Sequence, residues 1–399
     1  MTKMTYRRFG RTELQMPVLT CGGMRFQQGW QDIDFDEITD ESQRNLEATV
    51  RKALNCGINH IETARGYGCS ERQLGRILPD LPRGEMIVQT KVGPRETGDE
   101  FLEDFETSME RLKLDYVDLL GVHGINNDEI LDMTLKKGGT LDAARRLVAD
   151  GRVRHLGFST HGPTSTIVKA IETDAFDYVN LHWYWADQSN RPAIDAATAH
   201  DMGVFIISPN DKGGKLYDPP KKLVDLCAPL TPMGFNDLFC LWDKSVHTLS
   251  IGASRPEDFD AHLDILPFIG EQDGMLPPII KRLNSAAEAA LGTEWMAGWD
   301  KGLPPAGTAP GQVNLYHILR LYTLAKAYDM IEFGKMRYNL FGNGGHWFAG
   351  NKVDKLDWER LPPAITHSPV ADQIPAALRE AHEMLNAEDV KRLSESEES

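Results

Sequence analysis

Cysteine is scarce in this chain of 399 residues, which contains only Cys21, Cys56, Cys69, Cys227 and Cys240. The number is odd, and no two of them stand in a Cys-x-x-Cys spacing. Neither a disulfide framework nor a zinc ribbon is therefore predicted. A reducing, cytoplasmic setting is the expectation that fits such cysteine usage.

Long apolar runs and an excess of positive charge are also lacking. No segment approaches the length of about 18 apolar residues that a membrane span needs. The first residues, MTKMTYRRFGRTEL, have no apolar core of a signal peptide. With 43 Lys and Arg against 59 Asp and Glu, the formal net charge is −16. An acidic balance opposes binding to phosphate backbones and anionic lipid, so we predict neither a nucleic-acid nor a membrane partner.

The sequence does contain an alternation of short β-branched runs and longer amphipathic segments, from residue 46 to about 265. Strands that alternate with helices predict a parallel sheet. Eight such units favour a closed (β/α)8 TIM barrel, which uses about 250 residues, over an open sheet. The predicted strands are Leu19–Met24, His60–Thr63, Met86–Val92, Tyr116–His123, His155–Thr160, Tyr178–Trp183, Val204–Ser208 and Thr248–Ser254.

Two segments lie outside this alternation. Residues 1–18 predict a short hairpin before the first barrel strand. After about residue 270, the spacing of apolar residues in Pro277–Leu291 and Val313–Phe333 is helical. We therefore predict a barrel domain over residues 1–270 and a mainly helical extension over residues 271–399, which serves as a structural domain or as a lid.

Four polar side chains follow three successive predicted strands. Glu62 and Tyr67 come at and after the end of the second strand, Lys91 ends the third and His123 ends the fourth. Barrel enzymes carry their reactive groups at this end of the strands. A cation about 4–6 Å from a phenol favours the phenolate and lowers its pKa, a carboxylate holds the cation, and an imidazole orients a carbonyl. The set predicts proton transfer to a carbonyl oxygen; a structural Glu–Lys ion pair is the alternative.

The segments HIETARGYGCSERQLG, IVQTKV, RLKLDYVDLLGVH and RVRHLGFSTH resemble the aldo-keto reductase superfamily, over roughly residues 5–265. The resemblance implies a (β/α)8 barrel, a nicotinamide cofactor bound without a Rossmann fold, and carbonyl reduction. It implies that Tyr67 is the general acid and base, that Lys91 tunes it and that His123 orients the carbonyl. Glu62 stands where the family has Asp, so pairing with Lys91 is expected to need a shift of the backbone or of the lysine.

The resemblance also implies where the cofactor binds. Ser159 and Asn180 are expected to hold the nicotinamide amide, with Asn in place of the family's Gln. The glycine-containing loop after the seventh strand resembles the pyrophosphate loop; an ordinary turn is the alternative. NADP(H) is the family default, but Asp258 would repel a 2′-phosphate that Arg255 would attract, so NAD(H) stays open. The full expected set is Gly23, Met24, Ser159, Asn180, Ser208, Pro209, Asn210, Lys212, Gly213, Gly214, Gly252, Ser254, Arg255 and Asp258.

The C-terminal region resembles the extension of a larger branch of the family, some members of which carry a cysteine-ligated iron–sulfur cluster. No cysteine follows Cys240, so such a cluster is not expected there. Histidines such as His60 and His161 lack the spacing of metal ligands, and we predict no metal site.

Aromatic and basic side chains near the predicted barrel mouth are candidates for contacting the substrate. They suit a sugar or ring compound, or one with an anionic group. The aromatic residues have an alternative role in packing against the C-terminal extension, and the arginines in pairing with nearby acids. The candidates are Arg25, Trp30, Arg65, Trp183, Trp185 and Trp347, with His182 and Tyr184 beside them in sequence.

The predicted function is nicotinamide-dependent reduction of an aldehyde or ketone, or oxidation of the corresponding alcohol. A redox-neutral epimerase or lyase with tightly held cofactor is a second hypothesis, motivated by the extension and by Glu62. A non-catalytic subunit that senses the cofactor is a third, and the presence of Tyr67 and Lys91 argues against it. The expected partner is a small carbonyl or alcohol compound, and the oligomeric state is left open.

Overall fold

The computed structural model describes residues 3–26 and 28–387, which divide into two compact units. The first unit contains the residues up to Pro209 together with Asn236–Gln272. The second contains Asn210–Phe235 and the described residues from Asp273 onward. Residues 210–235 thus group with the C-terminal residues, whereas the sequence pattern places them in the barrel domain.

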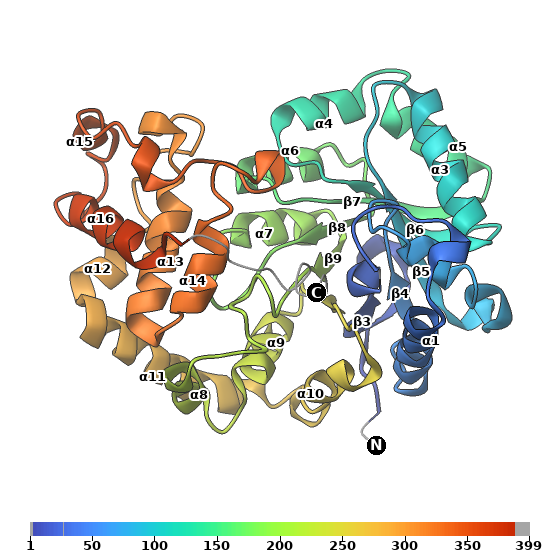
Figure 1. Cartoon of the computed structure of the whole chain (residues 1–399), viewed down its shortest axis with the longest axis horizontal. Helices are drawn as coiled ribbons and strands as arrows, with labels where there is room; N and C mark the ends of the chain where they lie inside the picture. Colours follow the sequence, from blue (N-terminus) through green and yellow to red (C-terminus); the bar gives the residue numbers. More distant parts are fainter. Residues whose placement is uncertain (1–2, 27, 388–399) are drawn as a thin grey trace. The chain divides into compact units, whose positions relative to one another are not determined.

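The first unit is a closed parallel barrel with helices around it (Figure 1). Its strands pair in the order β10-β3-β4-β5-β6-β7-β8-β9, which confirms the predicted TIM barrel. Their bounds are β3 Leu19–Gly22, β4 His60–Glu62, β5 Ile87–Val92, β6 Val117–His123, β7 Val153–Ser159, β8 Tyr178–Leu181, β9 Gly203–Ile206 and β10 Thr248–Ile251.

The barrel strands form because their side chains are buried on both faces. Every residue of β5, IVQTKV, is buried, and β6 is buried up to its last residue. Strands covered on both faces read as nearly continuous apolar runs rather than as an alternation. The polar residues within such runs therefore lie inside the barrel or at its end, and they are the ones to examine for chemistry.

The helices of the barrel unit follow the strands that they cover. Thr39 caps the start of α1, because its hydroxyl accepts a hydrogen bond from the Ser42 N–H at 3.2 Å. A capping box between Thr97 and Glu100 starts α3. The bounds are α1 Asp40–Asn55, α2 Ser70–Leu74, α3 Gly98–Leu112, α4 Asp128–Leu135, α5 Thr140–Ala149, α6 Thr164–Glu172, α7 Arg191–Ala199 and α10 Asp260–Leu263. The helix α9 (Pro232–Trp242) belongs to this unit from Asn236 onward.

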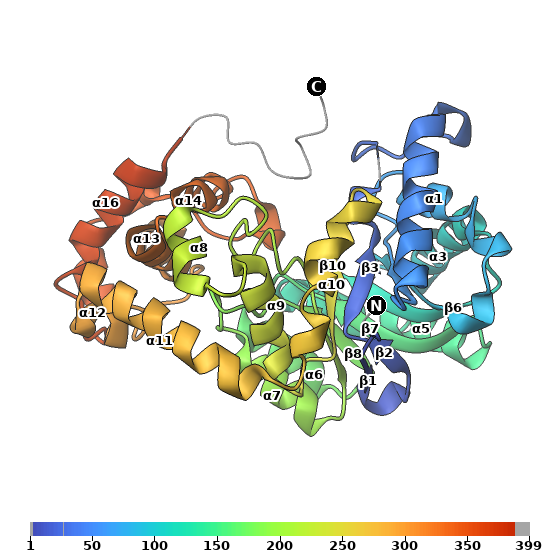
Figure 2. The same cartoon turned by 90° about the horizontal axis from the view of Figure 1, so that it is seen from below.

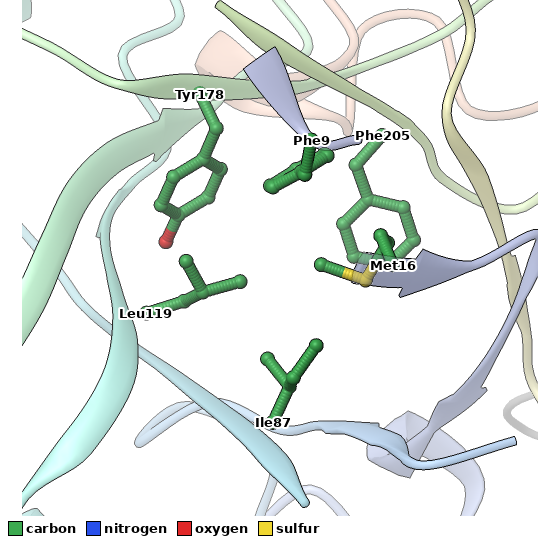
Figure 3. Packing of buried hydrophobic residues seen from close by; sticks show 6 residues of the cluster. All are labelled: Phe9, Met16, Ile87, Leu119, Tyr178 and Phe205. Carbon is green, nitrogen blue, oxygen red and sulfur yellow. The ribbon is translucent and has the colours of Figure 1, made fainter. Parts of the chain in front are cut away.

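The N-terminal hairpin closes the amino-terminal end of the barrel. Strands β1 (Tyr6–Arg8) and β2 (Gln15–Pro17) pair antiparallel, which confirms the predicted hairpin. Phe9 and Met16 of the hairpin are fully buried. Figure 3 shows them with the barrel side chains that share this apolar cluster, Ile87, Leu119, Tyr178 and Phe205.

The second unit is helical (Figure 2). Polar contacts tie its helices together: the Trp295 indole donates to the Thr323 hydroxyl at 2.9 Å, and the Tyr322 hydroxyl donates to Glu380 at 2.8 Å. The bounds are α8 Lys221–Cys227, α11 Gln272–Leu291, α12 Thr293–Gly298, α13 Leu315–Tyr328, α14 Ile331–Tyr338, α15 Leu361–Ala364 and α16 Ile374–Leu385. Within residues 3–26 and 28–387, none of the helices combines the length and the apolar character that crossing a bilayer requires.

Candidate active site

The carboxyl ends of β4, β5 and β6 bring the predicted catalytic residues to one edge of the barrel. β5 pairs with β4 on one side and with β6 on the other. Glu62 ends β4, Lys91 is the last residue but one of β5, and His123 ends β6. Tyr67 lies in the turn that follows β4. Three neighbouring strands and the turn after β4 therefore supply the four side chains.

Lys91 is the buried centre of this group. Its side chain is 2% exposed, and its ammonium group forms an ion pair with the Glu62 carboxylate. The same nitrogen donates to the Thr63 carbonyl at 2.8 Å. Gly121 lies opposite Lys91 in β6, where a methyl group would approach Lys91 Cγ to 2.9 Å, so a glycine leaves room for the lysine stem. The longer glutamate, in place of aspartate, thus keeps its pairing with the lysine.

Tyr67 and His123 complete the group around the lysine. Lys91 Nζ lies 4.8 Å from the centroid of the Tyr67 ring. The rings of Tyr67 and His123 meet edge to face, with centroids 5.7 Å apart and an interplanar angle of 85°. The structure thus places a phenol, an ammonium group and an imidazole side by side at the end of three adjacent strands.

Burial controls the proton affinities in this group. The enclosed position of Tyr67 raises the pKa of its phenol, because the surroundings disfavour the phenolate. Burial also lowers the pKa of Lys91, because it disfavours the ammonium form. The sequence predicts that the cation lowers the phenol pKa, whereas burial of Tyr67 in this structure raises it. The phenol therefore keeps its proton at neutral pH and can donate it.

Ser159 and Asn180 face each other at the ends of β7 and β8. Ser159 also lies opposite His123 in the β6–β7 register, so the amide pair continues the catalytic edge. Both amide atoms of Asn180 are buried and have no hydrogen-bond partner among the described residues. A buried amide without partners is rare in proteins and calls for a ligand or water. A carboxamide, which offers N–H donors and a carbonyl acceptor, has the complementary groups for this position.

Asp258 organises the loop after β10, where the adenosine end of a cofactor is expected. One of its oxygens accepts from the Ser254 N–H at 2.9 Å and from the Ser254 hydroxyl at 3.0 Å, and the other accepts from Arg255 Nε at 3.1 Å. Burial alone would raise the pKa of Asp258, but these hydrogen bonds and the nearby Arg25 guanidinium outweigh it and lower the pKa. The carboxylate is therefore charged and already paired with cations from its own loop and from Arg25, which lies 3.7 Å away.

Glycines at two further predicted cofactor positions have different surroundings. Gly23 begins a short 3₁₀ helix (Gly23–Arg25) after β3, and a methyl group there would lie 2.8 Å from the Glu62 carbonyl oxygen. Met24 follows it and is half-buried. At Gly252 a methyl group would meet only the Arg25 side chain, at 3.7 Å. Gly23 is thus required by close packing, whereas Gly252 leaves open space beside Arg25.

The predicted pyrophosphate loop is divided between the two units. Ser208, with a φ of +52°, and Pro209, whose carbonyl accepts from Asn236 Nδ2 at 3.1 Å, belong to the barrel unit. The remaining predicted residues lie in the second unit, where Gly214 has a φ of +144°. Their contact with a cofactor stays a prediction. These residues are Asn210, Lys212, Gly213 and Gly214.

The predicted substrate residues fall into three groups. Arg65 donates to Asp104 at 2.9 Å. This pairing with an acidic residue is the alternative to substrate binding that the sequence left open for the arginines. Trp183 is buried against Phe239, with ring centroids 5.4 Å apart, while Trp185 is half-buried and Trp30 is 44% exposed. Trp347 belongs to the second unit. Contact of these residues with substrate stays a prediction.

Sequence reasoning missed two structural contributions to the site. The Thr63 carbonyl and Gly121 shape the lysine position, and no motif marks either of them. It also did not link His161 with His182 and Tyr184, which lie in one hydrogen-bonded chain beyond the strand ends. The spacing of two residues from Ser159 to His161 and from Asn180 to His182 is the signal that identifies this pair. Among the described residues, no group of three or more His, Cys, Asp or Glu side chains is arranged to hold a metal ion.

Comparison with known proteins agrees with this architecture. Residues 18–216 match the model of the Aldo/keto reductase family. The chain is 31% identical to the L-galactose dehydrogenase of Arabidopsis thaliana over 188 residues, which is 45% of this chain and 52% of that protein. It is 27% identical to an aldo-keto reductase of Mycobacterium avium over 271 residues, which is 66% of this chain and 85% of that protein. The match to the dehydrogenase thus spans about half of that relative's length.

A solved structure supports the fold. The aldo-keto reductase of Klebsiella pneumoniae in complex with NADPH superposes with a TM-score of 0.55 and 19% sequence identity. The superposition covers 68% of this chain and 94% of that chain. The barrel, the N-terminal hairpin and the matched sequence segment lead to one conclusion. The chain belongs to the aldo-keto reductase family.

Proposed function

We propose that this protein is a nicotinamide-dependent oxidoreductase that reduces an aldehyde or ketone, or oxidises the corresponding alcohol. The observation that carries the proposal is the contact of Tyr67 with Lys91 and His123 at the carboxyl end of the barrel. A phenol between a cation and an imidazole suits proton exchange with a carbonyl oxygen. The oxidoreductase names of the relatives support the same class of reaction.

The residues present fit a nicotinamide. The unpartnered amide of Asn180 would exchange hydrogen bonds with the carboxamide, and Ser159 would contribute its hydroxyl beside it. A bound nicotinamide supplies hydride to a carbonyl carbon, or accepts it from an alcohol. The relative whose structure contains NADPH supports this cofactor class.

Tyr67 supplies the proton in the reductive direction. Its raised pKa keeps the phenol protonated, so its O–H can donate to the carbonyl oxygen that His123 orients. The phenolate that remains is stabilised by the Lys91 cation beside the ring. Glu62 holds the lysine through its ion pair and keeps the buried site electrically balanced. In the oxidative direction the same groups take the proton from an alcohol.

We further propose NADP(H) as the preferred form of the cofactor. Asp258 is the residue expected to repel a 2′-phosphate, but its oxygens already accept from Ser254 and Arg255. Arg25 adds a second cation near the same carboxylate. The charge of the Asp258 carboxylate is therefore partly offset by its partners, and the exposed Arg255 guanidinium supplies positive charge that favours a phosphate. A lower KM for NADPH than for NADH tests this preference.

The assay follows oxidation of NADPH across a panel of aldehydes and ketones, with Tyr67→Phe as the matched control. The variant keeps the ring beside Lys91 and His123 and removes only the hydroxyl. We expect turnover by the wild type and a loss of at least about a hundredfold in the variant, the range of general acid catalysis. Unchanged turnover in Tyr67→Phe would reject Tyr67 as the acid. Nicotinamide that stays bound and is never consumed would favour a redox-neutral reaction.

A further inference from the structure

Two arginines share one carboxylate beside the ends of β4 and β5. Arg65, in the turn after β4, donates from Nε to one oxygen of Asp104 at 2.9 Å. Arg95, in the loop after β5, donates from Nε to the other oxygen at 2.6 Å. The side chain of Asp104, which belongs to α3, is 12% exposed, whereas those of Arg65 and Arg95 are 29% and 51% exposed. An enclosed carboxylate thus holds two more exposed cations, and the cluster has one positive charge in excess.

The acidic residues near Arg65 do not remove this excess. Asp32 and Glu71 lie within electrostatic reach of Arg65. Asp32 already pairs with Arg72 at 2.9 Å and with Arg111. Arg111 also lies 3.7 Å from Glu71. Each of these two carboxylates therefore has an arginine other than Arg65 as its ion-pair partner.

The Nη groups of Arg65 and Arg95 keep their hydrogen-bonding capacity. Within residues 3–26 and 28–387, the side chains of both arginines donate only from Nε, and only to Asp104. Glu100, the other carboxylate that acts on the charge of Arg95, accepts from the Thr97 hydroxyl at 2.9 Å in the cap of α3. Because both Nε bonds end on one carboxylate, the two guanidinium groups are neighbours. Planar N–H forks of this kind recognise carboxylate and phosphate groups.

The cluster lies beside the catalytic turn and across the barrel from the predicted pyrophosphate loop. Arg65 precedes Tyr67 by two residues, and its backbone N–H donates to the Lys91 carbonyl at 3.0 Å. In the closed order of strands, β5 is four strands from β9, after which the predicted pyrophosphate loop begins. All three residues of the cluster belong to the barrel unit. An anion held there is therefore separate from the pyrophosphate of a cofactor.

We propose that Arg65 and Arg95 bind an oxyanion of the substrate, a phosphate or a carboxylate carried away from the reacting carbonyl. The inference rests on the proposed function, which places that carbonyl at Tyr67. Asp104 is the positioning residue, since it holds the two guanidinium groups side by side and neutralises only one of them. The site therefore selects anionic aldehydes or ketones over neutral ones with the same carbon chain.

The kinetic test compares two matched pairs of substrates at low salt: glyceraldehyde 3-phosphate with glyceraldehyde, and 4-oxobutanoate with butanal. The wild type should prefer the charged member of at least one pair. Arg95→Gln leaves Asp104 paired with Arg65. It should lower kcat/KM for the preferred anion about tenfold, the worth of one charge-assisted hydrogen bond, and for its neutral counterpart by less than about twofold.

Arg152→Gln is the matched control for Arg95→Gln. Arg152 pairs with Glu106, another acidic residue of α3, at 2.8 Å, and no excess charge results. The control should change kcat/KM for neither member of a pair by more than about twofold. Equal losses on charged and neutral substrates in Arg95→Gln, or a wild type without preference for either anion, would overturn the inference.

A second measurement does not depend on turnover. Isothermal titration calorimetry follows inorganic phosphate binding to the full chain, with NADP⁺ saturating so that the cofactor phosphate sites are filled. Arg95→Gln should weaken phosphate binding about tenfold, and Arg95→Glu, a charge reversal at an exposed position, should abolish it. Asp104→Asn removes the shared negative charge and should tighten binding, whereas a purely structural cluster would lose binding in this variant too.

The titration also separates failure of the inference from failure of the proposed function. No phosphate binding by the wild type, or equal binding by the wild type and Arg95→Glu, would overturn the inference, even if Asp104→Asn fails to fold. Phosphate binding that depends on Arg95, together with no turnover of any charged or neutral carbonyl, contradicts the proposed function instead.

Discussion

The two ends of the barrel are both buried, but they are built from opposite kinds of side chain. At the amino-terminal end, Phe9 and Met16 of the hairpin fill the barrel with apolar groups. At the carboxyl-terminal end, Lys91 and Glu62 are equally enclosed but charged. Burial of apolar side chains stabilises the fold. Burial of a charged side chain has a desolvation cost, which the opposite charge of its partner offsets. Substitutions at the two ends should therefore separate stability from activity.

The largest expected effect is that of Lys91→Met at the charged end. Without the lysine, the Tyr67 phenolate loses its cation, and kcat should fall about a hundredfold or more. Glu62 is left buried without its cation and with only a 3.5 Å hydrogen bond from the Ser250 hydroxyl, which should lower the free energy of unfolding by about 3–5 kcal/mol. Steady-state kinetics and urea unfolding measure the two effects.

The double variant Lys91→Met/Glu62→Gln is the matched control for this prediction. It removes both charges, so it should recover most of the lost stability and none of the lost activity. Recovery of activity together with stability would show that Lys91 acts only through the fold.

Phe9→Ala tests the apolar end. The side chain is fully buried, and Gly203 leaves room for its ring, since a methyl group there would lie 2.6 Å from the ring carbons. Removing such a ring typically lowers the free energy of unfolding by about 3–5 kcal/mol. The kcat measured well below the melting temperature should change by less than about twofold, because the catalytic edge is at the other end. A comparable loss of kcat in fully folded protein would contradict the separation of the two ends.

His60 is buried in the barrel, and its protonation should make the stability of the fold depend on pH. Its Nδ1 is 2.7 Å from the Thr20 hydroxyl oxygen, and burial, helped by the Lys91 charge, lowers its pKa from 6.5 to about 3. Between these values the unfolded chain binds a proton that the folded chain does not. Stability should therefore fall by up to about 1.4 kcal/mol for each unit of falling pH in this window.

Urea unfolding of wild type and His60→Gln from pH 7 towards pH 4 measures this contribution. The substitution should flatten the acid side of the stability curve, since glutamine takes up no proton. Curves of equal slope for the two proteins would show that His60 does not carry this acid sensitivity.

The smallest expected effect is that of Glu62→Asp, which introduces the family's usual residue. The charge is kept and the side chain is shortened by one methylene, so the ion pair with Lys91 is lengthened or needs a small rearrangement. We expect kcat to change by less than about tenfold, in contrast to the loss expected for Lys91→Met. Glu62→Gln, which keeps the length and removes the charge, should be more harmful than Glu62→Asp. The reverse order in steady-state kinetics would show that length matters more than charge here.

The barrel could be predicted from the sequence because its strands carry strong local signals. Runs such as IVQTKV are buried on both faces, and each is followed by an amphipathic segment. The gathering of Tyr67, Lys91 and His123 follows from the topology, since neighbouring parallel strands end at one edge. The order of the strand-end motifs along the chain was enough to predict that these three side chains lie close together.

Contacts between residues distant in sequence could not be predicted in the same way. Pairing of Arg65 with Asp104, and of Asp258 with Arg25, depends on side-chain directions that no local pattern encodes. The raised pKa of Tyr67 follows from the burial of its ring, and only the packed structure shows that burial. The same holds for the chain that links His161 to His182.

The most direct test of the central claim is to measure both turnover and cofactor affinity in Tyr67→Phe. The account predicts that the dissociation constant for NADPH stays within about threefold of the wild-type value, while kcat for the best carbonyl substrate falls at least about a hundredfold. A variant that binds NADPH normally and retains more than about a tenth of the wild-type kcat would contradict the assignment of the phenol as the proton donor.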